Sequence, residues 1–366
     1  MATEAPVPPP PTTAVDPEEG ASCDGPGADS HGAIVIVDTD SDGEVGSSEA
    51  AASPARPVVF RDPISALEDG RAGSLPEGVV DVYATGKDAW CDAEFTRGFV
   101  GYLWQTDASL DHRPNCEGRR VPQATVTTDM RHCLVDWLVD ITQEFKLQRS
   151  TLFLSVNILD RSLDLVPVRR ERLQLLGCAC VLIAAKLEEV YAPSVDDMVD
   201  ISANTYKRRE FVEYEMAVSQ ALGFRLSAPT ACHFLVHFIG VAQANPKQAA
   251  LAWYLAELCL LDYSLVGTRP GLLAAAILHL VRQATLSASA PDAGSSQAVW
   301  TPALRYYTRV APPALEATAR RVWAAHKRAW DSQYVAVPTK YQLAERFHVS
   351  EFVLVLPEGA LRFTGS

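Results

Sequence analysis

The sequence predicts an all-α protein with two tandem sets of about five helices, preceded by a disordered acidic tail. Apolar residues recur at helical spacing from about residue 93 to residue 332. Two stretches rich in small apolar residues, around Gly177 and Gly271, lie 94 residues apart and suggest an internal repeat. By contrast, residues 1–55 contain 11 Asp or Glu and no Lys or Arg. Such a segment cannot bury enough apolar surface to fold, and residues 1–80 are therefore predicted to be disordered.

Composition excludes several classes of protein. The chain has 366 residues, 48% of them hydrophobic, which is enough for a large core in two domains. Almost all of the net charge of -13 belongs to the tail, so the remainder lacks the basic excess of a nucleic-acid-binding protein. The 8 cysteines show no metal-type spacing, and no metal or other cofactor is predicted. There is no signal-peptide pattern and no apolar run of about 18 residues, so no membrane partner is predicted.

One stretch of the tail differs from the rest. Residues 33–44, AIVIVDTDSDGE, join four β-favouring aliphatic side chains to an acidic run. This pattern resembles a SUMO-interacting motif, which would add a strand to the edge of a partner's sheet. A chance apolar patch is the alternative, because short motifs match often by accident. The aliphatic residues concerned are Ile34, Val35, Ile36 and Val37.

A first helix is predicted over residues 93–107, and a polar loop over 111–127 follows it. Thr128 or Asp129 is then suited to cap a helix that runs to Phe145. Apolar residues of this helix cover more than half of its circumference, which predicts a core contact on one side and a second apolar surface elsewhere. Arg131 lies inside this arc, and if buried it needs a carboxylate partner. Asp160, on the next predicted helix, is the candidate.

The remaining helices follow in two sets. The third helix of the first set is apolar on every side, as a central helix packed against four others would be. After it, residues 191–193, YAP, end the helix. The predicted helices are residues 129–145, 150–163, 170–187, 195–201 and 207–222, then 230–241, 247–263, 270–284, 299–308 and 313–332.

Several ordered motifs resemble one family. MRHCLVDWLVD, from Met130, resembles the signature that opens the cyclin box, and the run KLEE from Lys186 resembles the end of its third helix. LAELCLLDYSLV, WTPALRYYTRV and VPTKYQLAERFHVS resemble the second box and C-terminal extension of B-type mitotic cyclins, with A-type cyclins a close second. The resemblance implies five parts: a tail (1–80), an N-terminal helix and loop (90–127), two cyclin boxes (128–226 and 227–335) and a C-terminal extension (336–366).

The resemblance implies a regulatory subunit rather than an enzyme, and no catalytic motif is present. Such a subunit would bind and activate a cyclin-dependent serine/threonine kinase and recruit its substrates in G2/M control, in the nucleus and cytoplasm. The implied kinase-binding residues are Lys186, Leu187, Glu188, Glu189, Glu215, Phe224, Phe99 and Tyr102. A groove for RxL-type substrate or inhibitor peptides would comprise Met130, Cys133, Leu134, Trp137, Asp140, Leu173 and Gln174. The alternative is a cyclin-fold transcription or scaffold protein that does not activate a kinase.

Overall fold

The computed structural model describes residues 79, 93–108, 114, 123, 125–289, 299–310 and 312–351. The segment expected to bind SUMO, residues 33–44, lies outside them. The described chain is helical and contains no strand, which confirms the all-α prediction. None of its helices combines the length and apolarity needed to cross a lipid bilayer.

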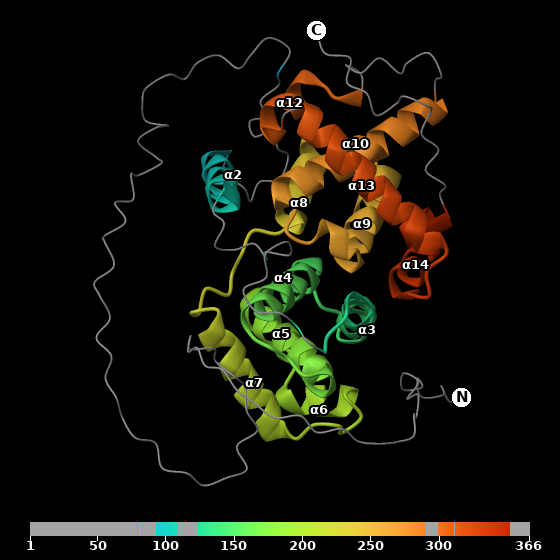
Figure 1. Cartoon of the computed structure of the whole chain (residues 1–366). Helices are drawn as coiled ribbons and strands as arrows, with labels where there is room; N and C mark the ends of the chain where they lie inside the picture. Colours follow the sequence, from blue (N-terminus) through green and yellow to red (C-terminus); the bar gives the residue numbers. More distant parts are fainter. Residues whose placement is uncertain are drawn as a thin grey trace, which may run out of the picture.

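Two sets of five helices account for most of the described chain (Figure 1). An N-terminal helix, α2 (Ala93–Ala108), precedes them, and a short helix, α14 (Ala336–Tyr341), follows them. The first set is α3 (Thr128–Glu144), α4 (Arg149–Leu165), α5 (Leu173–Glu188), α6 (Val195–Ile201) and α7 (Arg208–Ala221). The second set is α8 (Ala231–Val241), α9 (Pro246–Leu261), α10 (Pro270–Ser289), α12 (Pro302–Thr308) and α13 (Pro312–Trp330).

Local sequence fixes where several helices begin. The Thr127 hydroxyl accepts a hydrogen bond from the backbone N–H of Met130 at 3.3 Å and caps α3. A reciprocal capping box joins Ser194 to Asp197 at the start of α6. At α9, Asn245 caps the helix and Pro246 occupies its first turn, where a missing N–H costs nothing.

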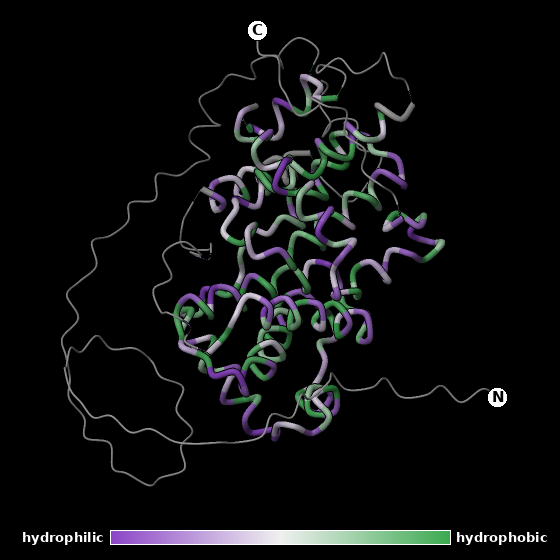
Figure 2. Tube along the Cα trace, turned by 45° about the vertical axis from the view of Figure 1, so that its right-hand side comes forward, coloured by the Kyte–Doolittle hydropathy of each residue, from purple (hydrophilic) through white to green (hydrophobic). Residues whose placement is uncertain are grey.

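Each set is built around its most apolar helix. Helix α5 is buried from Leu175 to Ala185 and contacts α3, α4 and α7. Gly177 permits the close approach of α3, since a Cβ there would lie 2.8 Å from Leu134 Cδ1. Helix α10 has the same place in the second set, in contact with α8, α9, α12 and α13. Figure 2 shows the apolar residues concentrated along these inner helices.

Helix α2 packs on the second set rather than on the first. The Trp104 ring lies 4.8 Å from the ring of Phe234 and 6.2 Å from that of Phe238, between ring centroids. Behind it, a Cβ on Gly271 would lie only 2.7 Å from the Trp104 ring. At the end of α2, the Asp107 carboxylate accepts two hydrogen bonds from Arg269, at 2.8 and 3.1 Å.

Candidate functional site: the junction of the two helix sets and the α5–α7 surface

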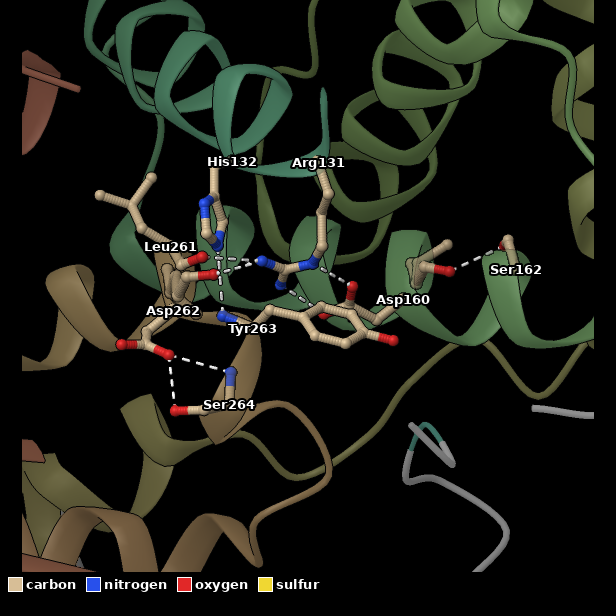
Figure 3. Close-up of polar contacts among 10 residues, drawn as sticks. Arg131, His132, Asp160, Ser162, Leu261, Asp262, Tyr263 and Ser264 are labelled. Atoms are coloured by element: carbon tan, nitrogen blue, oxygen red, sulfur yellow. Dashed lines mark hydrogen bonds and ion pairs between the residues drawn. The ribbon is translucent and has the colours of Figure 1, made fainter. Parts of the chain in front are cut away.

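Arg131, on the first turn of α3, joins the two sets of helices (Figure 3). Its Nε and Nη2 donate to the two carboxylate oxygens of Asp160 at 2.6 and 2.7 Å. Its Nη1 donates to the backbone carbonyls of Leu260 and Leu261, at 3.0 and 3.1 Å. These carbonyls end α9 and lack partners within the helix, and a positive charge is favourable at a helix C-terminus. One guanidinium therefore holds α3, α4 and α9 together.

Two neighbours of Arg131 also reach the second set. The Nε2 atom of His132 accepts a hydrogen bond from the backbone N–H of Tyr263 at 3.3 Å. The His132 ring meets the Tyr334 ring edge-on, with 5.6 Å between centroids. Burial and the adjacent positive charge of Arg131 lower the pKa of His132. The second set therefore covers the side of α3 on which His132 lies.

Asp136 fixes the start of α14. Its carboxylate oxygens accept hydrogen bonds from the backbone N–H groups of Val335 and Ala336, at 3.3 and 3.1 Å. Burial raises the pKa of Asp136 to about 6, and the negative charge of Asp140 acts in the same direction. Sequence reasoning missed Asp136, because its partners are backbone groups about 200 residues away and leave no side-chain signature.

These contacts explain part of the wide apolar arc of α3. The helix packs on α4 and α5 within its own set, and on α9 and α14 beyond it. The second apolar surface expected from the sequence is therefore partly covered by the same chain. The residues of α3 that stay at least partly accessible are Met130, His132, Cys133, Asp136, Trp137 and Asp140, together with Thr128, Asp129, Gln143 and Glu144.

The surface formed by α5 and α7 carries an ion pair with apolar side chains on the same two helices and the turn that follows them. Lys186, at the end of α5, pairs with Glu215 of α7. The side chain of Lys186 is 50% exposed and that of Glu215 is 20% exposed. Large hydrophobic residues remain in solvent on the same two helices and just after α7: Leu187, Val212, Met216 and Phe224. Such an accumulation of exposed apolar side chains is typical of a protein-binding surface.

Phe224 is held outward by the backbone. Gly223 and Phe224 have φ angles of 58° and 57°, in the left-handed region that ends many helices. A bulky residue adopts this conformation only at an energetic cost. The Phe224 ring nevertheless remains 64% exposed, so burial of the ring does not offset that cost.

Glu189 makes contacts within the first set of helices. Its carboxylate accepts hydrogen bonds from the backbone N–H of Gln148 at 2.6 Å and from the Thr151 hydroxyl at 2.5 Å. It thereby caps the start of α4, where Gln148 makes no side-chain cap of its own. The structure therefore gives Glu189 an internal role, whereas Glu188 lines a cleft beside Phe99 of α2.

Comparison with known families accounts for both sets of helices. A model described as cyclin, N-terminal domain, matches residues 100–227, and one described as cyclin, C-terminal domain, matches residues 229–354. This chain belongs to the cyclin family. The two helix sets are therefore its N-terminal and C-terminal cyclin boxes.

Several plant A-type cyclins are similar to this chain. Cyclin-A2-2 of Arabidopsis thaliana is 38% identical over 247 residues, which are 66% of this chain and 54% of that protein. Cyclin-A1-2 of Oryza sativa subsp. japonica is 36% identical over 67% of this chain and 51% of its own length. The cyclin thus spans about half the length of the curated relatives it matches. A solved viral cyclin from herpesvirus saimiri is 26% identical, covering 56% of this chain and 86% of its own, with a TM-score of 0.46.

These relatives correct one expectation. The sequence motifs had suggested B-type cyclins first and A-type cyclins second, and the comparisons support a mitotic cyclin with A-type relatives instead. The motifs that suggested B-type cyclins lie in the second box and the C-terminal extension.

The residues of the expected peptide groove differ in exposure. Cys133 and Asp140 are exposed, and Met130, Trp137 and Gln174 are partly exposed. Leu134 and Leu173 are each only 6% exposed, and Leu134 packs against Gly177 of the central helix. These two leucines pack mainly in the core, and their place in the floor of the groove stays a prediction. A helical residue at the margin of a core stripe cannot be placed on either side from its spacing alone.

Proposed function

We propose that this cyclin is a regulatory subunit that binds and activates a cyclin-dependent serine/threonine kinase and recruits its substrates in G2/M control. The observation that carries the proposal is the α5–α7 surface, where Lys186 and Glu215 pair and where Leu187 and, after α7, Phe224 are exposed. Family membership is consistent with it. A charged contact becomes strong when surrounding apolar groups exclude water, as these side chains would do under a kinase.

The first test compares kinase binding by the wild type and by Lys186→Ala, Glu215→Ala. Truncating charged contacts at a desolvated interface typically costs about 2–5 kcal/mol, which lowers affinity by orders of magnitude. A matched control is Glu316→Ala, Arg320→Ala, which removes an ion pair on α13 of the second box. Pull-down of a cyclin-dependent kinase followed by a histone-kinase assay provides the measurement. Normal activation by the first variant would show that this surface is not the activating one. No activation by the wild type would favour the alternative, a scaffold protein that does not activate a kinase.

The recruitment of substrates rests on the accessible part of α3. Trp137 presents an aromatic surface beside Met130, and Asp140 offers a carboxylate to the arginine of an RxL-type peptide. Trp137→Ala should weaken binding of such a peptide by about tenfold or more while kinase association is retained. Asp200→Ala, which changes an exposed acid on α6, is the control. Equal peptide affinity of the wild type and Trp137→Ala would exclude this groove as the docking site.

Two further proposals come from the sequence. Residues 34–37 would bind SUMO by strand addition, and the cyclin would act in the nucleus and cytoplasm. Replacing Ile34, Val35, Ile36 and Val37 by Ala removes the side chains that would fill the pockets of SUMO. A titration that gives equal affinity for this variant and the wild type would exclude the motif.

A further inference from the structure

A cleft of about 820 Å³ opens where the two boxes, α2 and the segment after α14 meet. Its size is in the range of ligand-binding clefts, about 300–1,000 Å³. One wall is the turn from α3 to α4, residues 142–152, and the opposite wall comes from α8, α9 and residues 340–346. The structure shows no segment of the described chain that fills it.

The charged groups of this cleft are predominantly basic. Lys146, Arg149, Lys340 and Arg346 line it, against two acidic residues, Glu188 and Glu345. The Glu345 side chain is 72% exposed and so lies largely in solvent. The N-terminus of α4 lies at the same place, but the Glu189 carboxylate already caps it, so the positive charge of the cleft comes from the side chains.

Arg149 is held rigidly but is only partly neutralised. Its guanidinium stacks on the Trp253 ring, 4.8 Å from the centroid. Its Nε is buried and has no hydrogen-bond acceptor, and Glu257 Oε1, at 3.8 Å, is beyond hydrogen-bonding distance. Glu257 is itself fully buried and already accepts hydrogen bonds from Lys340 Nζ and the Tyr341 hydroxyl, at 2.7 Å each. A positive charge in such surroundings favours an additional anion.

Apolar surface accompanies these charges. Val236, Leu343 and Phe99 line the cleft and are 59%, 51% and 44% exposed. A ligand that fits must therefore combine a block of aliphatic side chains with a block of carboxylates. An inorganic anion would leave the apolar part of the cleft in water.

We infer that the cleft binds residues 33–44 of the cyclin's own N-terminal tail. This segment has the required order, with the aliphatic run Ile34–Val37 followed by Asp38, Asp40, Asp42 and Glu44. The aliphatic side chains would cover Val236, Leu343 and Phe99, and the carboxylates would meet Lys146, Arg149 and Arg346. Docking would also shield the aliphatic run from SUMO, and it would cover Phe99 and Glu188 on the cyclin itself.

Because the tail is covalently attached to the helical body, a weak contact is sufficient to keep it in the cleft. Residues 45–92 connect Glu44 to Ala93, where α2 begins, and Phe99 of α2 lies in the cleft wall. Val79 packs against the core, so residues 45–78 are the tether, and a random-coil chain of this length has a root-mean-square span of about 29–35 Å. The resulting effective concentration is of the order of millimolar, so a peptide affinity near 100 μM would give a largely occupied cleft.

The test is a titration of a labelled peptide with the sequence of residues 33–44 into full-length protein, followed by fluorescence anisotropy. The peptide competes with the attached tail, so it is measured against the wild type and against Asp38→Asn, Asp40→Asn, Asp42→Asn, Glu44→Gln. The variant with the neutralised tail should bind the peptide about tenfold more tightly than the wild type. Equal affinity would overturn intramolecular docking.

A second pair of proteins locates the site. Added to the neutralised tail, Lys146→Glu, Arg346→Glu should abolish peptide binding, and these changes leave the buried contacts of Arg149 and Lys340 in place. Arg209→Glu, Arg320→Glu, which reverses two exposed charges on α7 and α13, should leave binding unchanged. Binding that survives the first pair, or that both pairs reduce equally, would overturn the assignment to this cleft. Circular dichroism checks that each variant is folded, and the readout requires no kinase.

Discussion

At the scale of single residues, the Arg131 side chain forms hydrogen bonds to both cyclin boxes. A buried ion pair contributes little net stability by itself, because desolvation offsets the attraction. Removal of one partner is different, because it leaves the other charge buried and uncompensated. Arg131 also donates hydrogen bonds to two backbone carbonyls of the second box. Arg131 therefore stabilises the contact between the boxes directly, whereas Asp160 bonds only to Arg131 there.

The Arg131–Asp160 pair gives a stability prediction. Asp160→Ala should lower the free energy of unfolding by about 3–5 kcal/mol. Arg131→Met, Asp160→Leu removes both charges and should recover part of this loss, although the α9 carbonyls remain without their donor. Thermal and urea unfolding, followed by circular dichroism, measure the stability of the single and the double variant. Asp200→Ala, which changes an exposed residue, is the control. An unchanged midpoint for Asp160→Ala would show that the pair does not stabilise the fold.

Asp136 gives a prediction with a defined pH window. Its pKa is about 6 in the folded protein and 3.8 as the reference value, so the folded state binds the proton more tightly. This contribution to stability is present below about pH 4 and is lost as the pH rises through 6. Asp136→Asn removes the charge and keeps one acceptor oxygen, so one of the N–H groups of Val335 and Ala336 loses its partner at every pH. The free energy of unfolding of the variant, relative to that of the wild type, should therefore be about 1–2 kcal/mol larger at pH 7.5 than at pH 5, after allowance for partial exposure. A difference between variant and wild type that is equal at both pH values would contradict the raised pKa.

At the scale of elements, α2 depends on the second box for its position. Trp104 fills a space between Phe234, Phe238 and Gly271, and the Asp107–Arg269 pair holds the end of the helix. Phe99 and Tyr102, on the same helix, remain exposed. The docking of α2 therefore decides where these two proposed kinase contacts lie.

Two glycine substitutions separate packing of α2 from its helix propensity. Gly271→Ala places a methyl group within 2.7 Å of the rigid Trp104 ring and should detach α2, at a cost of about 1–3 kcal/mol. Gly98→Ala meets nothing within 4 Å and should stabilise the same helix by up to about 1 kcal/mol. Hydrogen exchange of residues 98–107 measures both effects. Faster exchange in Gly98→Ala, or unchanged exchange in Gly271→Ala, would contradict this packing.

At the scale of the whole molecule, the two boxes should respond differently to acid. Burial lowers the pKa of His237, His279 and His326 to about 4, and all three lie in the second box. Each is charged in the unfolded chain below about pH 6.5 but resists protonation when folded, so stability is lost as the pH falls from 6.5 to 4. This loss should amount to several kcal/mol and exceed the opposite effect of Asp136.

Hydrogen exchange at pH 7 and pH 5 tests this difference between the boxes. At pH 5, helices α8, α10 and α13 should lose protection before α4 and α5 do. His279→Gln removes one titrating group and should make unfolding less sensitive to pH. Simultaneous loss of protection in both boxes would show that they unfold as one unit.

The sequence by itself determined the helices and their two sets. Helical spacing, capping residues and small-residue central helices act locally, and they placed most helix ends within a few residues. The pairing of Arg131 with Asp160 was also predictable, because a buried guanidinium needs a carboxylate and the next helix offered one. Lys186 and Glu215 were found through family motifs rather than through physical reasoning from spacing.

Only the tertiary structure decided how the boxes meet. The bonds from Arg131 to Leu260 and Leu261, and from Asp136 to Val335 and Ala336, end on backbone groups that have no residue-specific signature. The tertiary structure also shows how deeply Leu134 and Leu173 are buried, that His132 lies at the junction and that Glu189 caps α4. The physical reason is the same in each case. An apolar arc or an acidic residue shows in sequence that a partner is needed, and the partner is known only once distant helices are brought into contact.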